Sequence, residues 1–137
     1  LDDTTQRRVR HVITEIARVD AAVRAIRSRD WSVLGDLCFA SHDSLRDAYE
    51  VSCAELDVIV DAARELAGDG LAYGGRMTGG GFGGSAIVLG PPDRLDAVDH
   101  RIADAFQQRF GRSPTSWRVQ PGTAARSRRR SGARDIK

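Results

Sequence analysis

The chain has 137 residues, of which 41% are hydrophobic and 29% charged, and its formal net charge at pH 7 is +2. These values are typical of an ordinary globular protein and fit one domain or part of one. No apolar run approaches the roughly 18 residues that a transmembrane helix needs, and no signal peptide is recognisable, so we expect a cytoplasmic protein that does not enter a membrane.

The first predicted element is a helix over residues 5–28. Asp2, Asp3, Thr4 and Thr5 supply the residue types that cap a helix and favour its first turn. Apolar residues then recur at steps of three and four, which predicts an amphipathic helix with the inner face Val9, Val12, Ile13, Ile16, Val19, Val23 and Ile26. Arginine and glutamate fill the opposite face, which we expect to be solvated.

Two further helices are predicted before residue 70. Asp30 is the expected N-cap of the second helix, whose inner stripe is Leu34, Leu37, Cys38, Ser41, Leu45 and Ala48. The helical pattern breaks at residues 49–51. Ser52 and Glu55 then form an S-x-x-E capping box, and the third helix runs to about Ala67 with the inner residues Leu56, Ile59, Val60, Ala63 and Leu66.

The stretch of residues 74–89 contains a glycine-rich loop between two predicted strands. Half of the fourteen glycines lie between Gly74 and Gly84. Residues 85–89 are a short, partly β-branched apolar run that ends before Pro91, which predicts a buried strand. The alternation of Leu71, Tyr73 and Met77 predicts a strand before the loop.

This context excludes the two common nucleotide-binding loops. Gly79, Gly81 and Gly84 have the spacing of the dinucleotide pattern, but that pattern requires a helix after the loop, and here a strand follows. A Walker A loop needs a lysine after its last glycine, which is absent. Two interpretations remain open: backbone N–H groups that an anion can approach without a side chain in the way, or a hairpin loop with purely structural glycines.

A fourth helix, a short strand and a basic tail complete the predicted elements. Asp93 is the expected cap of the helix, Gly111 its end, and residues 116–119 the final strand. The expected inner residues of the helix are Leu95, Val98, Ile102, Ala105 and Phe106. Residues 126–137 hold six basic residues and one acidic residue (+5), which leaves 15 basic and 18 acidic residues (−3) elsewhere. We therefore expect a domain over residues 1–121 and a basic disordered tail over residues 122–137.

Neither the cysteines nor the histidines predict a metal site. Cys38 and Cys53 lack a metal or redox spacing, and we expect reduced thiols. His11, His42 and His100 have no partner at metal-ligand spacing. A lone histidine on a helix, such as His42, is typically a packing or hydrogen-bonding residue.

Two stretches resemble galactokinases, which belong to the GHMP kinases. One is residues 75–84, with the sequence GRMTGGGFGG, where the Arg-Met-Thr lead and the phenylalanine among the glycines are the galactokinase version of the motif. The other is residues 40–57, with the sequence ASHDSLRDAYEVSCAELD. The resemblance extends over about residues 5–121.

The resemblance implies an α+β fold, namely the ferredoxin-like C-terminal domain of GHMP kinases, with helices packed on a small antiparallel sheet and the N-terminal part missing. It implies transfer of the ATP γ-phosphoryl group to the anomeric hydroxyl of galactose, with ATP and Mg as cofactors. The family's phosphate loop, catalytic aspartate and arginine are not found here. We therefore expect no catalytic residue, no activity of this chain alone, and a missing N-terminal kinase domain as its partner, in keeping with a chain that begins at Leu1.

The resemblance places the glycine loop on the phosphate side of the ATP site, and the expected loop residues are Thr78, Gly79, Gly80, Gly81, Gly83 and Gly84. Arg76 is either an electrostatic helper or one partner of a surface ion pair. Tyr49 either faces the active cleft or is a core aromatic residue.

Two other function classes stay open. A small α+β layer with a basic tail is compatible with an RNA-binding or regulatory module, although the predicted strands lack the exposed aromatic pairs that stack bases. Nucleic acid is therefore the less favoured partner. The chain is also compatible with a degenerate, non-catalytic remnant of a kinase.

Overall fold

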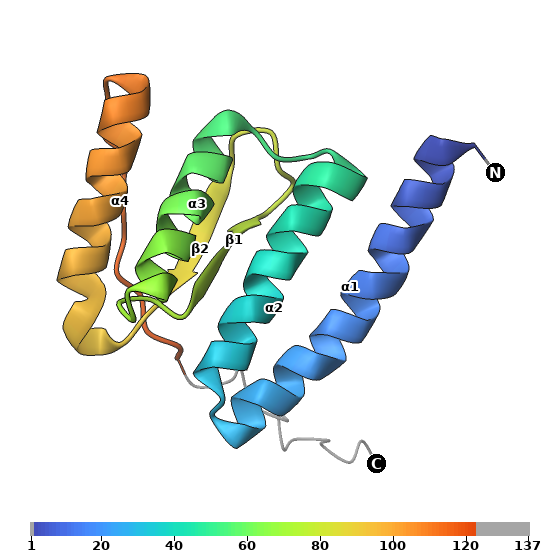
Figure 1. The fold of residues 1–137 in the computed structure, drawn as a ribbon, viewed down its shortest axis with the longest axis horizontal. Helices are drawn as coiled ribbons and strands as arrows, with labels where there is room; N and C mark the ends of the chain where they lie inside the picture. Colours follow the sequence, from blue (N-terminus) through green and yellow to red (C-terminus); the bar gives the residue numbers. More distant parts are fainter. Residues whose placement is uncertain (1, 123–137) are drawn as a thin grey trace, which may run out of the picture.

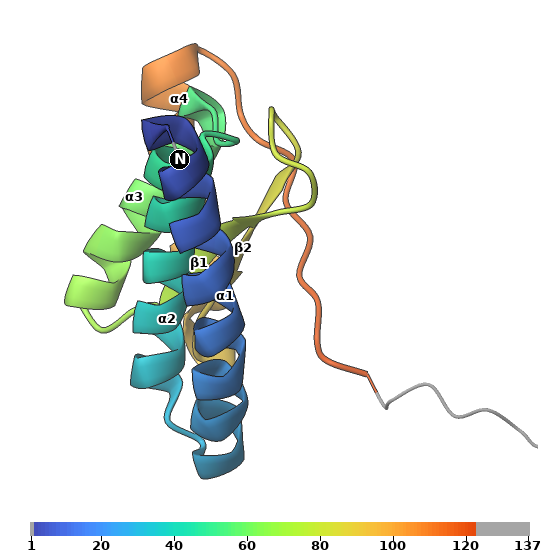
Figure 2. The same cartoon turned by 90° about the vertical axis from the view of Figure 1, so that its right-hand side faces the viewer.

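The computed structural model describes residues 2–122, which form a layer of helices on one side of a β-hairpin (Figures 1 and 2). Helices α2 and α3 contact β1, α4 packs on α3, and α1 packs on α2 and η1 at the opposite end of the layer. This arrangement is the predicted α+β fold. The elements are α1 (Asp3–Ser28), α2 (Trp31–Asp43), the π-helix η1 (Ser44–Tyr49), α3 (Ala54–Gly68), β1 (Gly74–Thr78), β2 (Ser85–Leu89), the 3₁₀-helix η2 (Pro92–Arg94) and α4 (Leu95–Phe110).

The predicted caps of the first two helices are confirmed. The Asp2 side chain accepts a hydrogen bond from the Thr5 N–H at 2.9 Å, and Asp30 accepts one from the Val33 N–H at 3.1 Å. Each carboxylate satisfies a backbone donor that lacks a partner within its helix. Two other expected caps are wrong. Ser52 bonds the Asp57 side chain instead of capping α3, whose N-cap is Cys53, and α4 begins after η2 without a side-chain cap from Asp93.

The apolar face of α1, which the sequence predicts to be buried, is exposed. Its apolar residues are exposed: Val12 by 51%, Ile16 by 64% and Val19 by 62%. The buried residues of this helix are His11 and Ala25 instead. The amphipathic pattern is present, but within the described residues most of its apolar side stays exposed.

The core lies between α2, α3 and the hairpin. Its buried residues are Phe39, Val60 and Ala63, and a second cluster of Leu66, Ala72 and Val98 joins α3 to α4. Of the stripe predicted for α2, Ser41 is buried as expected, but the other buried residues of this helix are Gly35, Phe39 and His42.

Close approach of two backbones explains why α2 turns Gly35 toward β1. A Cβ on Gly35 would lie 1.7 Å from the Tyr73 carbonyl oxygen, and one on Gly74 would lie 2.3 Å from the Gly35 Cα. Only glycine at both positions lets the helix lie this near to the strand.

The sheet is narrower than predicted. β1 and β2 pair antiparallel from Gly74↔Leu89 to Thr78↔Ser85, which confirms the strand–loop–strand motif. β2 is only partly buried, with Ile87 44% exposed. The predicted strand at residues 116–119 is wrong: Trp117 and Val119 are each 77% exposed, and the segment is not hydrogen-bonded to the sheet.

Residues 116–119 do not form a strand because a strand needs a neighbouring strand to pair with its backbone N–H and C=O groups. A groove of about 1060 Å³ separates the segment from β2, and its other walls come from α3, α4 and residues 82–84.

The basic tail cannot be compared with its prediction, because residues 123–137 lie outside the described residues. Across residues 2–122, no helix combines the length and the apolar character needed to cross a membrane.

Candidate functional site

The glycine loop, residues 79–84, is the candidate functional site. It connects the ends of β1 and β2, where Thr78 pairs with Ser85. Among residues 2–122, no further atom lies within 4 Å of a Cβ built on Gly79, Gly80 or Gly83. The backbone at these three glycines is therefore open to a ligand or to another part of a protein.

The tip of the loop is fixed against residue 51. The Phe82 N–H donates a hydrogen bond of 2.9 Å to the Val51 carbonyl, and a Cβ on Gly81 would lie only 2.2 Å from the same oxygen. Gly81 has a φ of +85° and Phe82 one of +57°. Glycine at position 81 thus has a structural reason within this chain, whereas Gly80 has none: its φ is not left-handed and its surroundings are empty.

Tyr49 and the loop line the same hollow. This open hollow, of about 660 Å³, is lined by Tyr49, Glu50 and Val51 after α2, by Phe82 of the loop, and by Arg8, Val9, Val12 and Ile13 of α1. Tyr49 is 40% exposed and stacks on the His11 ring at a centroid distance of 4.5 Å. It is therefore not a core aromatic residue.

A pair of charges closes one side of this hollow. The Arg8 guanidinium donates to Glu50 at 2.6 Å and to the Ala48 carbonyl at 2.6 Å. The same arginine lowers the pKa of Glu50, so this carboxylate is ionised at neutral pH. Both side chains are partly exposed, and the pair contributes little to stability. Its effect is to hold residues 48–50 against α1.

Arg76 does not join Tyr49 and the loop tip. Its Nε donates to the Met77 carbonyl at 2.9 Å, and its guanidinium lies 3.9 Å from Glu15 of α1. Glu15 also accepts from the Ser41 hydroxyl at 2.6 Å. The structure thus places Arg76 in the ion pair that the sequence left open as an alternative.

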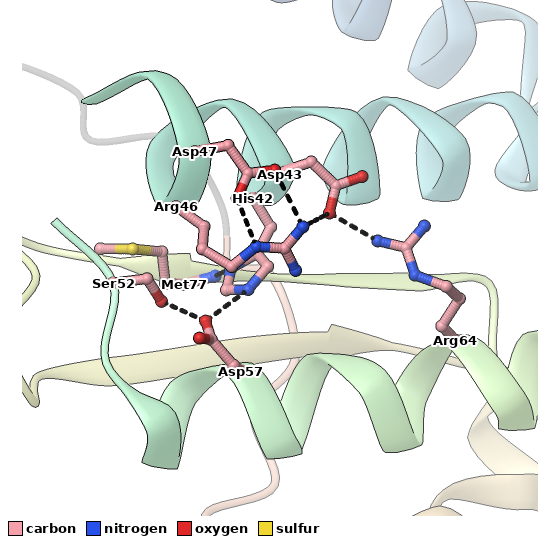
Figure 3. A network of polar contacts seen from close by, with 8 residues as sticks. All are labelled: His42, Asp43, Arg46, Asp47, Ser52, Asp57, Arg64 and Met77. Carbon is pink, nitrogen blue, oxygen red and sulfur yellow. Dashed lines mark hydrogen bonds and ion pairs between the residues drawn. The ribbon is translucent and has the colours of Figure 1, made fainter. Parts of the chain in front are cut away.

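A buried polar network supports the base of the loop (Figure 3). His42 is fully buried on α2, and its Nδ1 accepts a 3.2 Å hydrogen bond from the Met77 N–H, two residues before the loop. Its Nε2 lies 3.2 Å from Asp57 Oδ1, and the Ser52 hydroxyl donates to the same oxygen at 2.5 Å. The expectation that His42 is a hydrogen-bonding residue is confirmed, but its partners on β1 and α3 carry no sequence signal.

Burial favours the neutral form of His42. Burial lowers its pKa, and Arg46 acts in the same direction, while Asp57 and Asp43 oppose the change. Because Nδ1 accepts from a backbone N–H, the ring proton resides on Nε2 and faces Asp57. Around this core, Arg46 bonds Asp47 and Arg64 bonds Asp43, both near the surface.

The described residues do not offer a metal site of their own. Among residues 2–122, no group of three or more histidine, cysteine, aspartate or glutamate side chains is arranged to hold a metal ion. What the site does offer is an open glycine backbone on a loop fixed at both ends.

Comparison with known proteins gives a consistent match. The family model of the GHMP kinases C terminal matches residues 22–108. A galactokinase of Thermotoga maritima is 43% identical over 111 residues, covering 81% of this chain and 31% of the relative. A galactokinase of Streptomyces coelicolor is 43% identical over 125 residues, covering 91% of this chain and 31% of the relative.

Solved structures agree with the sequence matches. Lactococcus lactis galactokinase, complexed with galactose, superposes with a TM-score of 0.76 at 37% identity and covers 82% of this chain and 28% of that protein. L. major mevalonate kinase, in complex with R-mevalonate, gives a TM-score of 0.61 at 32% identity. This match covers 79% of this chain and 31% of that protein. The chain thus spans less than a third of the length of these relatives.

Proposed function

The chain belongs to the GHMP kinases through their C-terminal domain, and on that premise we propose that it is the C-terminal part of a galactokinase. Such an enzyme transfers the γ-phosphoryl group of ATP to the anomeric hydroxyl of galactose. The observation that carries the proposal is the galactokinase form of the glycine motif, GRMTGGGFGG, within a match of 43% identity to galactokinases over most of the chain.

We further propose that the loop approaches the ATP phosphates. Phosphoryl transfer depends on positioning and on neutralising charge around the transferred group. A loop without side chains lets backbone N–H groups come near an anion. Gly79, Gly80 and Gly83 form the open part of this surface, Thr78 and Gly84 flank it, and Gly81 and Phe82 fix it to Val51.

The remaining chemistry is assigned to residues outside this chain. The described residues lack a set of ligands for Mg²⁺, and the sequence lacks the family's phosphate loop and catalytic aspartate. The cofactors ATP and Mg²⁺ and the substrate galactose are therefore proposed to be held mainly by an N-terminal kinase part. This chain contributes the opposing wall of the site.

Two apolar surfaces are proposed to contact that N-terminal part. One is the exposed stripe of α1, and the other is the groove between β2 and residues 114–119. Large exposed apolar surfaces are rare on a domain that acts alone and typically mark contacts with other parts of a protein. The length of the relatives, more than three times the matched segment, supplies enough additional chain to cover both.

The proposal is tested with a chimera in which this chain replaces the matched C-terminal segment of the Thermotoga maritima galactokinase. Galactose-dependent ADP formation is expected from the chimera. The isolated 137-residue chain is expected to show none above a control without enzyme. Turnover by the isolated chain would contradict the assignment of the catalytic groups to an N-terminal part.

A further inference from the structure

Asp57 contacts two residues, His42 and Ser52, and hydrogen bonds connect each of them, directly or through its neighbour, to the glycine loop. One path runs from the base of the loop, since the Met77 N–H bonds His42, whose other ring nitrogen faces Asp57 Oδ1. The second path runs from the tip, where the Phe82 N–H bonds the carbonyl of Val51. The next residue, Ser52, donates to the same Asp57 oxygen (Figure 3).

Two hydrogen bonds of this network differ from those usually found at a strand edge and at a helix start. The Met77 N–H is satisfied by a side chain, where a strand at the edge of a sheet would leave it to solvent. Ser52 directs its hydroxyl to Asp57, where a capping residue would direct it to the helix backbone. Both departures lead to the same carboxylate oxygen.

Burial and Arg46 favour the neutral ring of His42 and outweigh Asp57 and Asp43, which favour the charged ring. Asp57 approaches from α3, Asp43 lies on the same helix as His42, Arg46 lies on η1, and β1 contributes the Met77 N–H. Hydrogen bonds to an ionised carboxylate are about twice as strong as those between neutral groups. Asp57 is thus well suited to hold a neutral histidine and a hydroxyl in fixed positions.

We propose that Asp57 is a positioning residue that fixes the base of the glycine loop through His42 and its tip through Ser52. We also expect this positioning to strengthen ATP binding, and only that expectation rests on the proposed function. The geometric claim concerns the loop alone and is testable in the isolated chain.

Amide hydrogen exchange of the 137-residue chain, measured by NMR, reports each end separately. The Met77 N–H reports the base, the Phe82 N–H reports the tip, and the Tyr73 N–H, bonded to the Leu89 carbonyl at 2.7 Å, is the reference for the hairpin itself. The loss of a charge-assisted hydrogen bond predicts that Asp57→Ala accelerates exchange at Met77 and Phe82 about tenfold or more. The Tyr73 rate stays unchanged.

Three further variants separate positioning from general stability. Ser52→Ala accelerates exchange at Phe82 and leaves Met77 unchanged, and Asp57→Asn, which keeps a carbonyl oxygen for both donors, restores most of the protection. Asp61→Ala, which removes the same charge one turn along α3 at an exposed position, changes none of the three amides. Equal acceleration of all three amides by Asp57→Ala, or no acceleration at Phe82 in either Asp57→Ala or Ser52→Ala, would overturn the proposal.

The chimera then tests the consequence for the nucleotide. Ser52→Ala is expected to raise the KM for ATP with little change in the KM for galactose, and Asp61→Ala is expected to change neither. A chimera that lacks activity refutes the proposed function and leaves the exchange result standing. A KM for ATP unchanged by Ser52→Ala, in an active chimera whose Phe82 amide is deprotected, refutes the role of the positioning in ATP binding.

Discussion

The Cα of Gly81 faces the carbonyl of Val51 so closely that a Cβ at position 81 would lie 2.2 Å from the Val51 oxygen. This contact joins the loop between the two strands to the segment between η1 and α3. It also divides the glycines of the loop into those that the fold requires and those that it leaves unexplained. Gly80 is the clearest member of the second group, because a Cβ there would meet nothing within 4 Å in the part of the chain that the structure describes.

Gly81→Ala is expected to destabilise the isolated chain by about 2 kcal/mol or more, since a left-handed φ alone costs a non-glycine residue roughly 1–2 kcal/mol and the overlap with Val51 adds to it. Gly80→Ala is expected to change the free energy of unfolding by less than about 0.5 kcal/mol, as is usual for open surface positions. Urea unfolding of both variants measures the difference. Equal effects would contradict the division of the two glycines.

Gly80→Val is expected to impair the chimera at the nucleotide. If the ATP phosphates approach the loop at this point, the added side chain raises the KM for ATP at least about tenfold, or 1.4 kcal/mol, and leaves the melting temperature unchanged. Gly68→Val is the matched control, because Gly68 also has an ordinary φ and empty surroundings but lies at the end of α3. ATP kinetics that respond equally to both variants would argue against a phosphate-side loop.

His42 is expected to make the stability of the chain depend on pH. Burial lowers its pKa in the folded state below the ordinary value of 6.5, so the unfolded state binds more protons below that pH. The free energy of unfolding therefore falls as the pH drops below 6.5 and is fully restored above it. Urea unfolding between pH 7.5 and 5 measures this slope.

Two variants identify the group responsible for the slope. His42→Gln, which keeps a donor toward Asp57, flattens the dependence between pH 6.5 and 5, while His100→Gln at an exposed position on α4 leaves it unchanged. A slope that persists in His42→Gln would show that another group controls it.

Val19→Asn tests the apolar stripe of α1. Val19 is 62% exposed, and valine and asparagine have similar helix propensities, so the isolated chain is expected to keep its stability within about 0.5 kcal/mol. The chimera is expected to lose melting temperature, because the substitution places an amide in the proposed interface with the N-terminal part. Asp20→Asn, on the neighbouring exposed position, is the control. An unchanged melting temperature of the Val19→Asn chimera would leave this stripe outside the interface.

The sequence predicted those features that depend on local chemistry. Asp2 and Asp30 cap their helices, Gly111 ends α4 in a left-handed conformation, and the apolar run after the glycines forms a strand. Each of these follows from a few neighbouring residues. The glycine loop between two strands was recognisable for the same reason.

The features that failed depend on what lies across space. The stripe that includes Val12 and Val19 on α1 has the period of a buried face, but periodicity cannot say whether a partner is present. The S-x-x-E pattern at Ser52 predicted a local cap, whereas Asp57 competes for its hydroxyl. The network joins His42 to Asp57, 15 positions away in the sequence, and to Met77, 35 positions away, and no local pattern reports contacts at such separations.

The most direct test of the central claim is the rate of galactose-dependent ADP formation by the chimera. A second chimera, with the matching segment of the Streptomyces coelicolor galactokinase at the same junction, shows that the junction permits activity, and the truncated Thermotoga maritima part alone gives the background. We predict that the chimera with this chain turns over galactose well above that background. A chimera that melts cooperatively but stays at the background, beside an active control chimera, would contradict the assignment of this chain as a galactokinase C-terminal domain.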